Sequence, residues 1–441
     1  MSFPRYPKYK DSGVEWVGEV PEHWLTKPLY SSAGERNESN KGMIEKNLLS
    51  LSYGRIVRKD ISSNDGLLPE SFETYQVVRP GDIVFRPTDL QNDWRSLRSA
   101  IVEETGIITS AYIAVIPNGP NPKYLSHLFR AYDAMKVFYS MGGGLRQSMK
   151  YSDLKRLPII VPPVAEQRAL AEFLDRETAK IDALVAEQQR LMELLNEKRQ
   201  AVISHAVTKG LNPNAPMKPS GIEWLGDVPA HWNVSPLKHV CRIESGHTPQ
   251  KTNEAYWLPE DCCLPWISLN DTKILAASDF IDDTTVKISA KGMANSSAHF
   301  IESGAVVMNR DGARVGLSAI TTKPMCVSQH IIAWVCGPLV FNHYLLHVLY
   351  AMNDEIYRLA GGSTIPTIGM PEVRQMTMPL PPVEEQTAIV RHLLEARQRI
   401  DTLTAEAQRA INLLQERRTA LISAAVTGQI DVRPLLKMEA A

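Results

Sequence analysis

Two long stretches of the chain carry apolar residues at alternating spacings of three and four, the pattern of a helix that packs along a narrow seam. The first stretch follows Pro162-Pro163 and the second follows Pro381-Pro382. Proline fits at a helix start and breaks a helix interior, so each pair marks a start. The expected seam residues are Ile181, Leu184, Leu191, Leu195 and Val202 in the first helix and Ile400, Leu403, Ala407, Ala410, Leu414 and Leu421 in the second, with Gln188, Lys198 and Arg417 as polar members.

Two helices with matching seams are expected to pair as a coiled coil, either antiparallel or parallel. The polar seam members would cost stability and fix the register of the pair. In the alternative arrangement, each helix packs on its own domain instead of on the other helix.

The remaining segments are mixed in character. Runs of four to six apolar or β-branched residues bounded by Gly and Pro predict strands at 75–78, 82–85, 305–308 and 330–334. Helices are expected near residues 123–139 and 342–359. This mixture predicts α+β domains with a twisted sheet.

The sequence contains an internal repeat. Residues 12–24 (SGVEWVGEVPEHW) recur at 220–232 (SGIEWLGDVPAHW), and PPVAEQ at 162–167 recurs as PPVEEQ at 381–386. The motif RQAVISHAVT, which begins at residue 199, returns as RTALISAAVT from residue 418. Similar motifs in the same order predict a duplicated unit, each copy a mixed domain followed by a long helix.

The duplication predicts four parts, with boundaries at 1–161 (first mixed domain), 162–209 (first helix), 210–380 (second mixed domain) and 381–441 (second helix and tail). In copy two, the SGxEW segment directly follows the first helix. By pseudo-two-fold symmetry, residues 12–24 are expected to dock near the end of the second helix.

Charge and composition narrow the function classes. The 48 basic and 49 acidic residues give a net charge of −1, which excludes a histone-like polycation. The first 160 residues hold 21 basic and 18 acidic residues, net +3, whereas residues 221–380 hold 11 and 15, net −4. Both long helices are neutral. A stand-alone DNA binder driven by charge is therefore not expected.

The start of the chain has no apolar signal segment, and no stretch approaches the roughly 20 apolar residues of a membrane helix. The five cysteines form no C-x-x-C pair, so neither a zinc site nor a disulfide framework is expected. These features predict a reduced, cytoplasmic protein without a membrane partner or a metal of its own.

Clusters of Arg, Asn and Lys are the candidate DNA contacts, because Arg and Asn make bidentate contacts with base edges. Ordinary surface charge is the alternative interpretation of each residue. The candidates are Arg55, Arg58, Arg86, Asn92, Arg95, Arg98, Arg146 and Lys150 in the first domain and Asn270, Lys273, Asn309, Arg310 and Arg314 in the second. No P-loop, G-x-G-x-x-G, H-E-x-x-H or G-x-S-x-G motif occurs, so no catalytic residues are expected.

Taken together, these motifs resemble the specificity (S) subunits of type I restriction-modification enzymes over essentially the whole chain. The resemblance rests on the doubled SGxEWxGxVPxHW and PPVxEQ motifs, on GHTPQK from residue 246 with LPWISLND ending at residue 271, and on NRDGARVG at 309–316. Copy one lacks clear counterparts of GHTPQK and PWISLND, so the two mixed domains are expected to differ in detail.

The resemblance implies a fold of two mixed α/β target-recognition domains, joined by two long helices that form an antiparallel coiled coil. It implies that each domain reads one part of a bipartite site in double-stranded DNA, and that the helices set the gap and dock two methylase (M) subunits. Restriction (R) subunits join that assembly. The cofactors S-adenosylmethionine, ATP and Mg would sit on those partners, and the S subunit itself would be non-catalytic. The rival hypothesis is a coiled-coil adaptor that does not bind DNA.

Overall fold

The computed structural model describes residues 3–61, 69, 71–90, 93, 97–142, 148–361 and 366–435. The chain forms two compact units. Unit 1 consists of residues 1–189 and 408–441, and unit 2 of residues 190–407. Each unit therefore takes one part of each long helix, α3 (Val164–Lys209) and α10 (Val383–Val426).

Unit 1 is built around a four-stranded antiparallel sheet of order β4-β11-β8-β9. Its strands and helices before α3 are β1 (Tyr9–Asp11), β2 (Glu19–Pro21), β3 (Leu25–Pro28), β4 (Ala33–Glu35), β5 (Leu49–Ser52), β6 (Arg55–Arg58), β7 (Gln76–Val78), β8 (Ile83–Phe85), β9 (Ser99–Ile101), β10 (Gly106–Ile108), β11 (Ile113–Pro117), α1 (Pro122–Ala134), η3 (Val137–Ser140), α2 (Tyr151–Leu154) and β12 (Pro158–Val161). Short two-stranded pairs, β1-β2, β3-β12, β5-β6 and β7-β10, flank the main sheet.

Unit 2 repeats this plan with additions. Its five-stranded sheet has the order β16-β24-β21-β22-β18, whose first four strands match the unit 1 sheet strand by strand. Unit 2 also has a four-stranded sheet, β19-β17-β23-β20, whose counterparts in unit 1 are the pairs β5-β6 and β7-β10, linked there by an isolated parallel bridge between Leu48 and Ile107. Its elements before α10 are β13 (Met217–Pro219), β14 (Asp227–Pro229), β15 (Asn233–Pro236), α4 (Leu237–Val240), β16 (Cys241–Ser245), η4 (Glu254–Tyr256), β17 (Cys262–Ile267), η5 (Leu269–Asp271), α5 (Thr272–Ala277), β18 (Phe280–Ile281), β19 (Lys287–Ser289), α6 (Ala290–Ala294), β20 (Phe300–Ile301), β21 (Val306–Asn309), β22 (Ser318–Thr321), β23 (Met325–Val327), β24 (Ile331–Cys336), α7 (Asn342–Ala351), α8 (Asn353–Leu359), α9 (Met370–Gln375) and β25 (Thr377–Leu380).

Local sequence explains where α1 begins and ends. The side chain of Asn121 accepts hydrogen bonds from the amides of Lys123 and Tyr124, and Pro122 occupies the first turn, where a missing N–H costs nothing. The helix ends at Ala134, because Lys136 adopts a left-handed conformation with φ of 63°. The single helix expected over 123–139 is therefore a helix followed by the 3-10 turn η3.

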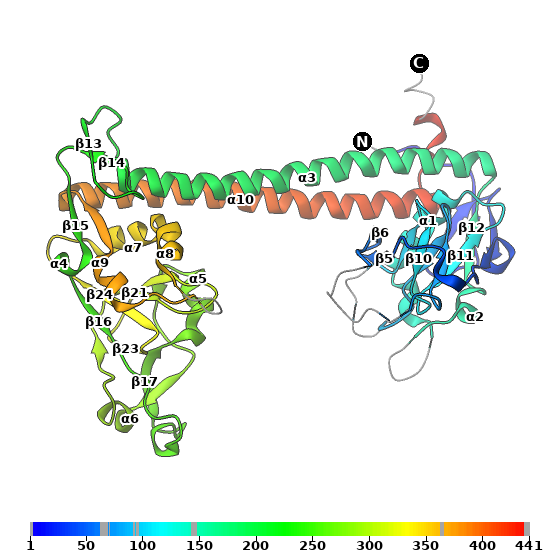
Figure 1. The fold of residues 1–441 in the computed structure, drawn as a ribbon. Coiled ribbons are helices and arrows are strands. Elements are labelled where there is room, and N and C mark those ends of the chain that lie inside the picture. Colours follow the sequence, from blue (N-terminus) through cyan, green and yellow to red (C-terminus); the bar gives the residue numbers. More distant parts are fainter. Residues whose placement is uncertain are drawn as a thin grey trace. The chain divides into compact units, whose positions relative to one another are not determined.

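The long helices pair within each unit, so the expected coiled-coil packing is confirmed and its direction is antiparallel. In unit 1, Ile181 near the middle of α3 shares a buried core with Leu421 and Ile422 near the end of α10. In unit 2, Ala206 and Val207 at the end of α3 share a core that also contains Ile389 near the start of α10. Figure 1 shows α10 running beside α3.

Along the seam, every second residue is the expected one, and each residue between them lies one position later than expected. The buried or half-buried residues that follow the heptad are Ile181, Val185, Gln188, Met192, Leu195, Arg199 and Val202 on α3 and Ile400, Thr404, Ala407, Ile411, Leu414, Arg418 and Leu421 on α10, and Asp182 and Ala410 are half-buried beside them. The two sets lie 219 positions apart, residue for residue. Ile181, Leu195, Val202, Ile400, Leu414 and Leu421 are thus confirmed as seam residues.

Leu184, Leu191 and Leu403 are wrong as helix–helix seam residues, because their exposed fractions are 46%, 40% and 46%. Both phases of the heptad share every seventh position, and the leucines that suggested the other phase face solvent. The expected polar seam residues Lys198 and Arg417 are likewise exposed, and their neighbours Arg199 and Arg418 take those places.

Candidate nucleic-acid interface

Arg55 and Arg58 lie on β6 in unit 1, and both side chains are exposed. Arg55 Nη2 lies 3.5 Å from Asp182 on α3, and Arg58 forms a bidentate pair with Glu104. This pairing raises the pKa of Arg58 and lowers that of Glu104. DNA contact by these two arginines would therefore compete with carboxylates already in place.

Arg98 is the clearest correction among the candidate DNA contacts, because it is fully buried. Its guanidinium donates to the backbone carbonyls of Thr88 (2.6 Å), Asp89 (3.0 Å) and Asp93 (2.5 Å). Arg98 thus holds together the loop after β8 and does not face a ligand. A cluster of arginines in sequence gives no warning that one of them points inward.

The remaining candidates in the first domain are less enclosed. Arg86 follows β8 and is half-buried, with Nη1 3.8 Å from Asp93. Lys150 is exposed immediately before α2. Three candidates, Asn92, Arg95 and Arg146, lie outside the described residues.

Asn309 is the second correction, since it is only 1% exposed at the end of β21. Its amide nitrogen donates to the carbonyls of Asp311 and Arg314, and its oxygen accepts from the amide of Leu317. Asn309 therefore shapes the loop that carries Arg310 and Arg314. Arg310 is half-buried beside Asp311, whereas Arg314 is exposed.

Asn270 and Lys273 are exposed on η5 and α5, and Asn270 lines a cavity of about 550 Å³ in unit 2. The cavity is bounded by Thr248, Pro249, Gln250, Lys251, Trp257, Trp266, Ser268, Leu269, Asn270, Val286, Ser328, Gln329 and His330. It therefore gathers the GHTPQK and WISLN motifs, far apart in sequence, around one opening. We call this the amide cavity, because Gln250, Asn270 and Gln329 present exposed amides to it.

Two tryptophans form part of the wall of the amide cavity. The rings of Trp257 and Trp266 meet edge to face, with centroids 5.8 Å apart. Their indole N–H groups donate to the carbonyls of Gln250 and His247, respectively, both at 3.2 Å. The tryptophans thereby fix the loop that carries Gln250 against β17.

A chain of hydrogen bonds crosses the rim of the amide cavity and involves residues that the sequence did not single out. Asp311 Oδ2 lies 2.5 Å from His330 Nδ1, and His330 Nε2 lies 3.2 Å from Gln329 Nε2. The hydroxyl of Thr248 donates to Gln329 Oε1 at 2.6 Å. The only sequence signal for Gln329 is its place beside a histidine, in a segment without Gly or a charge cluster.

The doubled motifs meet each other in both units. In unit 1, Glu166 of PPVAEQ accepts from the indole of Trp24 (2.9 Å) and from Tyr6 (3.1 Å), and it lies 2.7 Å from His23 Nε2. In unit 2, the equivalent Glu385 lies 2.9 Å from His231 Nε2. His23 and Trp24 in unit 1, and His231 in unit 2, therefore tie the mixed domain to the start of a long helix.

The glutamines of the same motifs serve the backbone. Gln167 is buried, accepts from the amide of Asn121 and donates to the carbonyl of Pro162. Gln386 makes the same contacts in unit 2, with the amide of Phe341 and the carbonyl of Pro381. The expected docking of residues 12–24 at the end of the second helix is also confirmed, because Gly428, just past α10, packs against Pro21 and Trp24.

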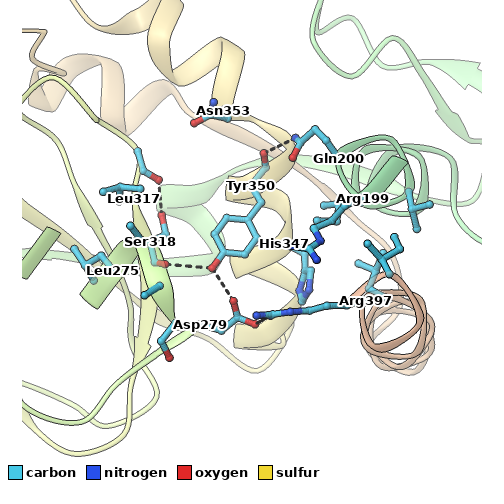
Figure 2. A pocket seen from close by; sticks show the side chains of 18 of the residues that line it. Arg199, Gln200, Leu275, Asp279, Leu317, Ser318, His347, Tyr350, Asn353 and Arg397 are labelled. Carbon is cyan, nitrogen blue, oxygen red and sulfur yellow. Dashed lines mark hydrogen bonds and ion pairs between the residues drawn. The ribbon is translucent and has the colours of Figure 1, made fainter. Parts of the chain in front are cut away.

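A second cavity in unit 2, of about 320 Å³, lies where α3 and α10 meet the mixed domain (Figure 2). The Tyr350 hydroxyl donates to Asp279 (3.0 Å), and Asp279 pairs with Arg397 of α10. Gln200 of α3 donates to the Tyr350 carbonyl (3.0 Å). Burial raises the pKa of Tyr350 and lowers that of His347, so both side chains favour their neutral forms. These contacts fasten the helices to the domain.

Within the described part of the chain, no group of three or more His, Cys, Asp or Glu side chains could hold a metal ion. None of the described helices combines the length and apolar character needed to span a membrane.

Comparison with known proteins gives a consistent result. Residues 229–412 match the family model of the type I restriction modification DNA specificity domain. The specificity subunit assigned to the type I restriction enzyme MjaX of Methanocaldococcus jannaschii is 22% identical over 95% of this chain and 96% of its own length. The EcoR124I/EcoR124II specificity subunit of Escherichia coli is 23% identical over 77% of each chain.

Solved structures share the fold. A chain from work on complex assembly and conformational transition of the type I R-M system has a TM-score of 0.68 and 18% identity, covering 92% of this chain and 98% of that one. The HsdS subunit from Thermoanaerobacter tengcongensis has a TM-score of 0.52 and 18% identity, covering 93% and 98%.

Proposed function

Because this chain is a relative of the specificity subunits of type I restriction-modification enzymes, we propose that it selects the DNA sequence on which such an enzyme acts. In this proposal the site is bipartite, and each mixed domain reads one half-site. The chain provides sequence selection and scaffolding, and the chemical steps belong to its partners.

The observation that carries the proposal is one scaffold with two different surfaces. The strand order β4-β11-β8-β9 recurs as β16-β24-β21-β22, and the pairs β5-β6 and β7-β10 recur as β17-β19 and β20-β23. On this common plan copy two carries the further strand β18 and lines the amide cavity with residues of the GHTPQK and PWISLND motifs, for which copy one has no clear counterparts. A reader of two unlike half-sites needs this combination, because base contacts specify a sequence while the scaffold only positions them.

The charge of the second domain supports DNA binding that is shared between this chain and its methylase partners. Residues 221–380 of the second domain carry a net charge of −4, which favours neutralisation of part of the DNA phosphates by partner subunits. Phosphate contacts by methylase subunits would supply this sequence-independent part of the affinity, and the specificity chain would supply base reading.

Docking of two methylase subunits is supported by exposed leucines at equivalent places on the two helices. Leu184 and Leu403, 219 positions apart, are each 46% exposed, and Leu194 and Leu413 repeat the relation at 45% and 65%. Large apolar side chains that stay exposed at equivalent places in both copies suit contacts with a partner protein. Two equivalent surfaces suit two copies of one partner.

The proposed assembly also includes restriction subunits. S-adenosylmethionine would bind the methylase subunits, and ATP and Mg would be used by the partners. This chain would hold no cofactor of its own.

Methylation mapping tests the proposal. The chain is co-expressed with a type I adenine methylase subunit, and methylated adenines in the host genome are located by single-molecule sequencing. The expected result is a single motif of two short half-sites separated by a fixed gap. A complex that forms without any sequence preference would contradict the proposal and favour the coiled-coil adaptor.

A further inference from the structure

We propose that Gln329 is a base-reading residue of the second domain and that it selects an adenine in the half-site read by this domain. This inference rests on the proposed DNA-reading function. Its evidence is the hydrogen-bond chain at the rim of the amide cavity.

Hydrogen bonds within the protein set the orientation of the Gln329 amide. Its oxygen accepts from the Thr248 hydroxyl at 2.6 Å, which defines the oxygen end of the group. His330 donates through Nδ1–H to Asp311 at 2.5 Å, which leaves Nε2 of the imidazole as an acceptor for Gln329 Nε2–H at 3.2 Å. Both ends of the amide are therefore held, so the group is oriented before any ligand arrives.

The Gln329 amide keeps hydrogen-bonding capacity that the protein does not use. A primary amide has two N–H donors and an oxygen with two lone pairs. After the contacts with Thr248 and His330, Gln329 keeps one donor and one acceptor, and its side chain is exposed. In the major groove an adenine presents an acceptor, N7, beside a donor, N6–H. The free pair on Gln329 has the complementary pattern.

Two further side chains at the amide cavity, those of Asn270 and Lys251, suit contacts with DNA. Asn270, also exposed at this cavity, has no hydrogen-bond partner for its side-chain amide among the described residues, and Lys251 lies exposed at the same mouth. A second amide suits reading of the neighbouring base edge, and the ammonium suits a phosphate. None of the described residues that line this cavity is an arginine, the residue that most commonly contacts guanine.

The Asp311–His330 pair gives the NRDGARVG motif a role in this model. Asp311 is 8% exposed and is fixed by the loop that Asn309 organises. We assign Asp311, His330 and Thr248 as positioning residues, since they act on DNA through Gln329.

The test uses the full chain assembled with its methylase subunit, with single-molecule methylation mapping as the readout. Gln329→Ala is expected to accept any base at one position of one half-site, a loss of about 5- to 150-fold in preference for adenine. Gln329→Glu offers only acceptors, so the same position is expected to shift towards cytosine, whose N4–H2 is a donor. Thr248→Val frees the amide to rotate and is expected to weaken preference at that position alone.

Gln375→Glu is the matched control, because Gln375 is exposed on α9 of the same unit and does not border the amide cavity. It is expected to keep the wild-type motif. A Gln329→Ala complex that keeps adenine selection at every position of both half-sites would overturn the inference. Failure of the proposed function looks different, because the wild-type complex itself would then show no motif.

Discussion

Arg418 Nε lies 3.0 Å from Asp182 Oδ1, which ties the last part of α10 to α3 across the seam of unit 1. The residues 219 positions away from this pair, Arg199 and Asp401, are paired in the same way in unit 2. Each arginine occupies a seam position and each aspartate flanks the opposite seam. The duplication therefore preserved a polar contact that can only form when the helices run antiparallel.

This contact is expected to give a small but real coupling energy. Arg418 and Asp182 are 28% and 38% exposed, so their interaction should contribute about 0.2–1 kcal/mol. Single alanine variants and the double variant, compared by urea unfolding, measure the coupling. Because Arg55 also lies 3.5 Å from Asp182, the cycle is repeated in an Arg55→Ala background. A coupling energy of zero in both backgrounds would remove the contact as a register device.

Glu166→Gln is expected to destabilise unit 1 by about 1–3 kcal/mol. The carboxylate accepts hydrogen bonds from the Tyr6 hydroxyl and from the buried indole of Trp24, and glutamine replaces one of its accepting oxygens with an amide group that donates. The matched control is Glu385→Gln. Glu385 meets the half-exposed His231, and the indole nitrogen of Trp232 has no hydrogen-bond partner in the described structure. The control should cost less than about 1 kcal/mol. Equal shifts in the two unfolding midpoints would contradict this difference.

The raised pKa of Asp133 predicts that this residue lowers the free energy of unfolding as pH rises, which is the reverse of the usual effect of a carboxylate. Burial raises the pKa of this carboxyl from 3.8 to about 6, although it accepts from the Arg98 amide. The folded state therefore binds a proton more tightly than the unfolded state. The stability contribution is largest below pH 4 and falls as pH rises to about 6, by up to about 3 kcal/mol for a shift of about two units.

Asp133→Asn removes this titration, so the difference in unfolding free energy between wild type and variant should shift in favour of the variant between pH 4 and pH 6. Urea unfolding at half-unit pH steps provides the measurement. The carboxyl of Asp175, whose pKa is lowered by its contacts with His127 and Lys123, should contribute in the opposite direction below pH 4 in both proteins alike. A constant difference across this range would show that Asp133 is ionised throughout.

The exposed leucines are expected to matter for assembly and not for folding. Leu184→Asp combined with Leu403→Asp should leave the unfolding free energy within about 0.5 kcal/mol per site, as for other surface changes. The same variant should lose co-purification with the methylase subunit. Gln189→Asp, at an exposed polar position on α3, is the control for introducing a carboxylate. Full retention of the complex by the double variant would place methylase docking elsewhere.

Arg98→Ala should unfold or loosen the first domain, because three backbone carbonyls lose a buried charged donor. A loss of about 3–5 kcal/mol is expected, as for other disrupted buried charge contacts. Arg86→Ala, on the half-buried neighbour, should leave the unfolding midpoint nearly unchanged. Thermal unfolding followed by circular dichroism separates the two. A stable Arg98→Ala protein would restore Arg98 as a candidate DNA contact.

Periodicity, proline placement and repeats were enough to predict the architecture. The helix expected from residue 162 to 209 begins at Val164 and ends at Lys209. The predicted phase of the seam is wrong because both phases share Ile181 and Leu195, and the exposed leucines Leu184, Leu191 and Leu403 fit the spacing of the other phase. Hydrophobicity does not reveal whether a leucine faces another helix or another protein.

The candidate DNA contacts were predicted less well, since residue type does not fix the direction of a side chain. Arg98 and Asn309 belong to the right chemical class for DNA but serve their own loops. Gln329 depends on Thr248, 81 positions away, and such a contact exists only after the chain has folded.

The division of each long helix between two units has a consequence for synthesis. The core of unit 1 includes Leu421, Ile422, Ala425 and Val426, together with Ile430 and Val432 beyond the end of α10. A ribosome makes these residues after the whole of unit 2. The domain that is translated first is thus the one that is completed last. Its core stays incomplete until these residues have been made.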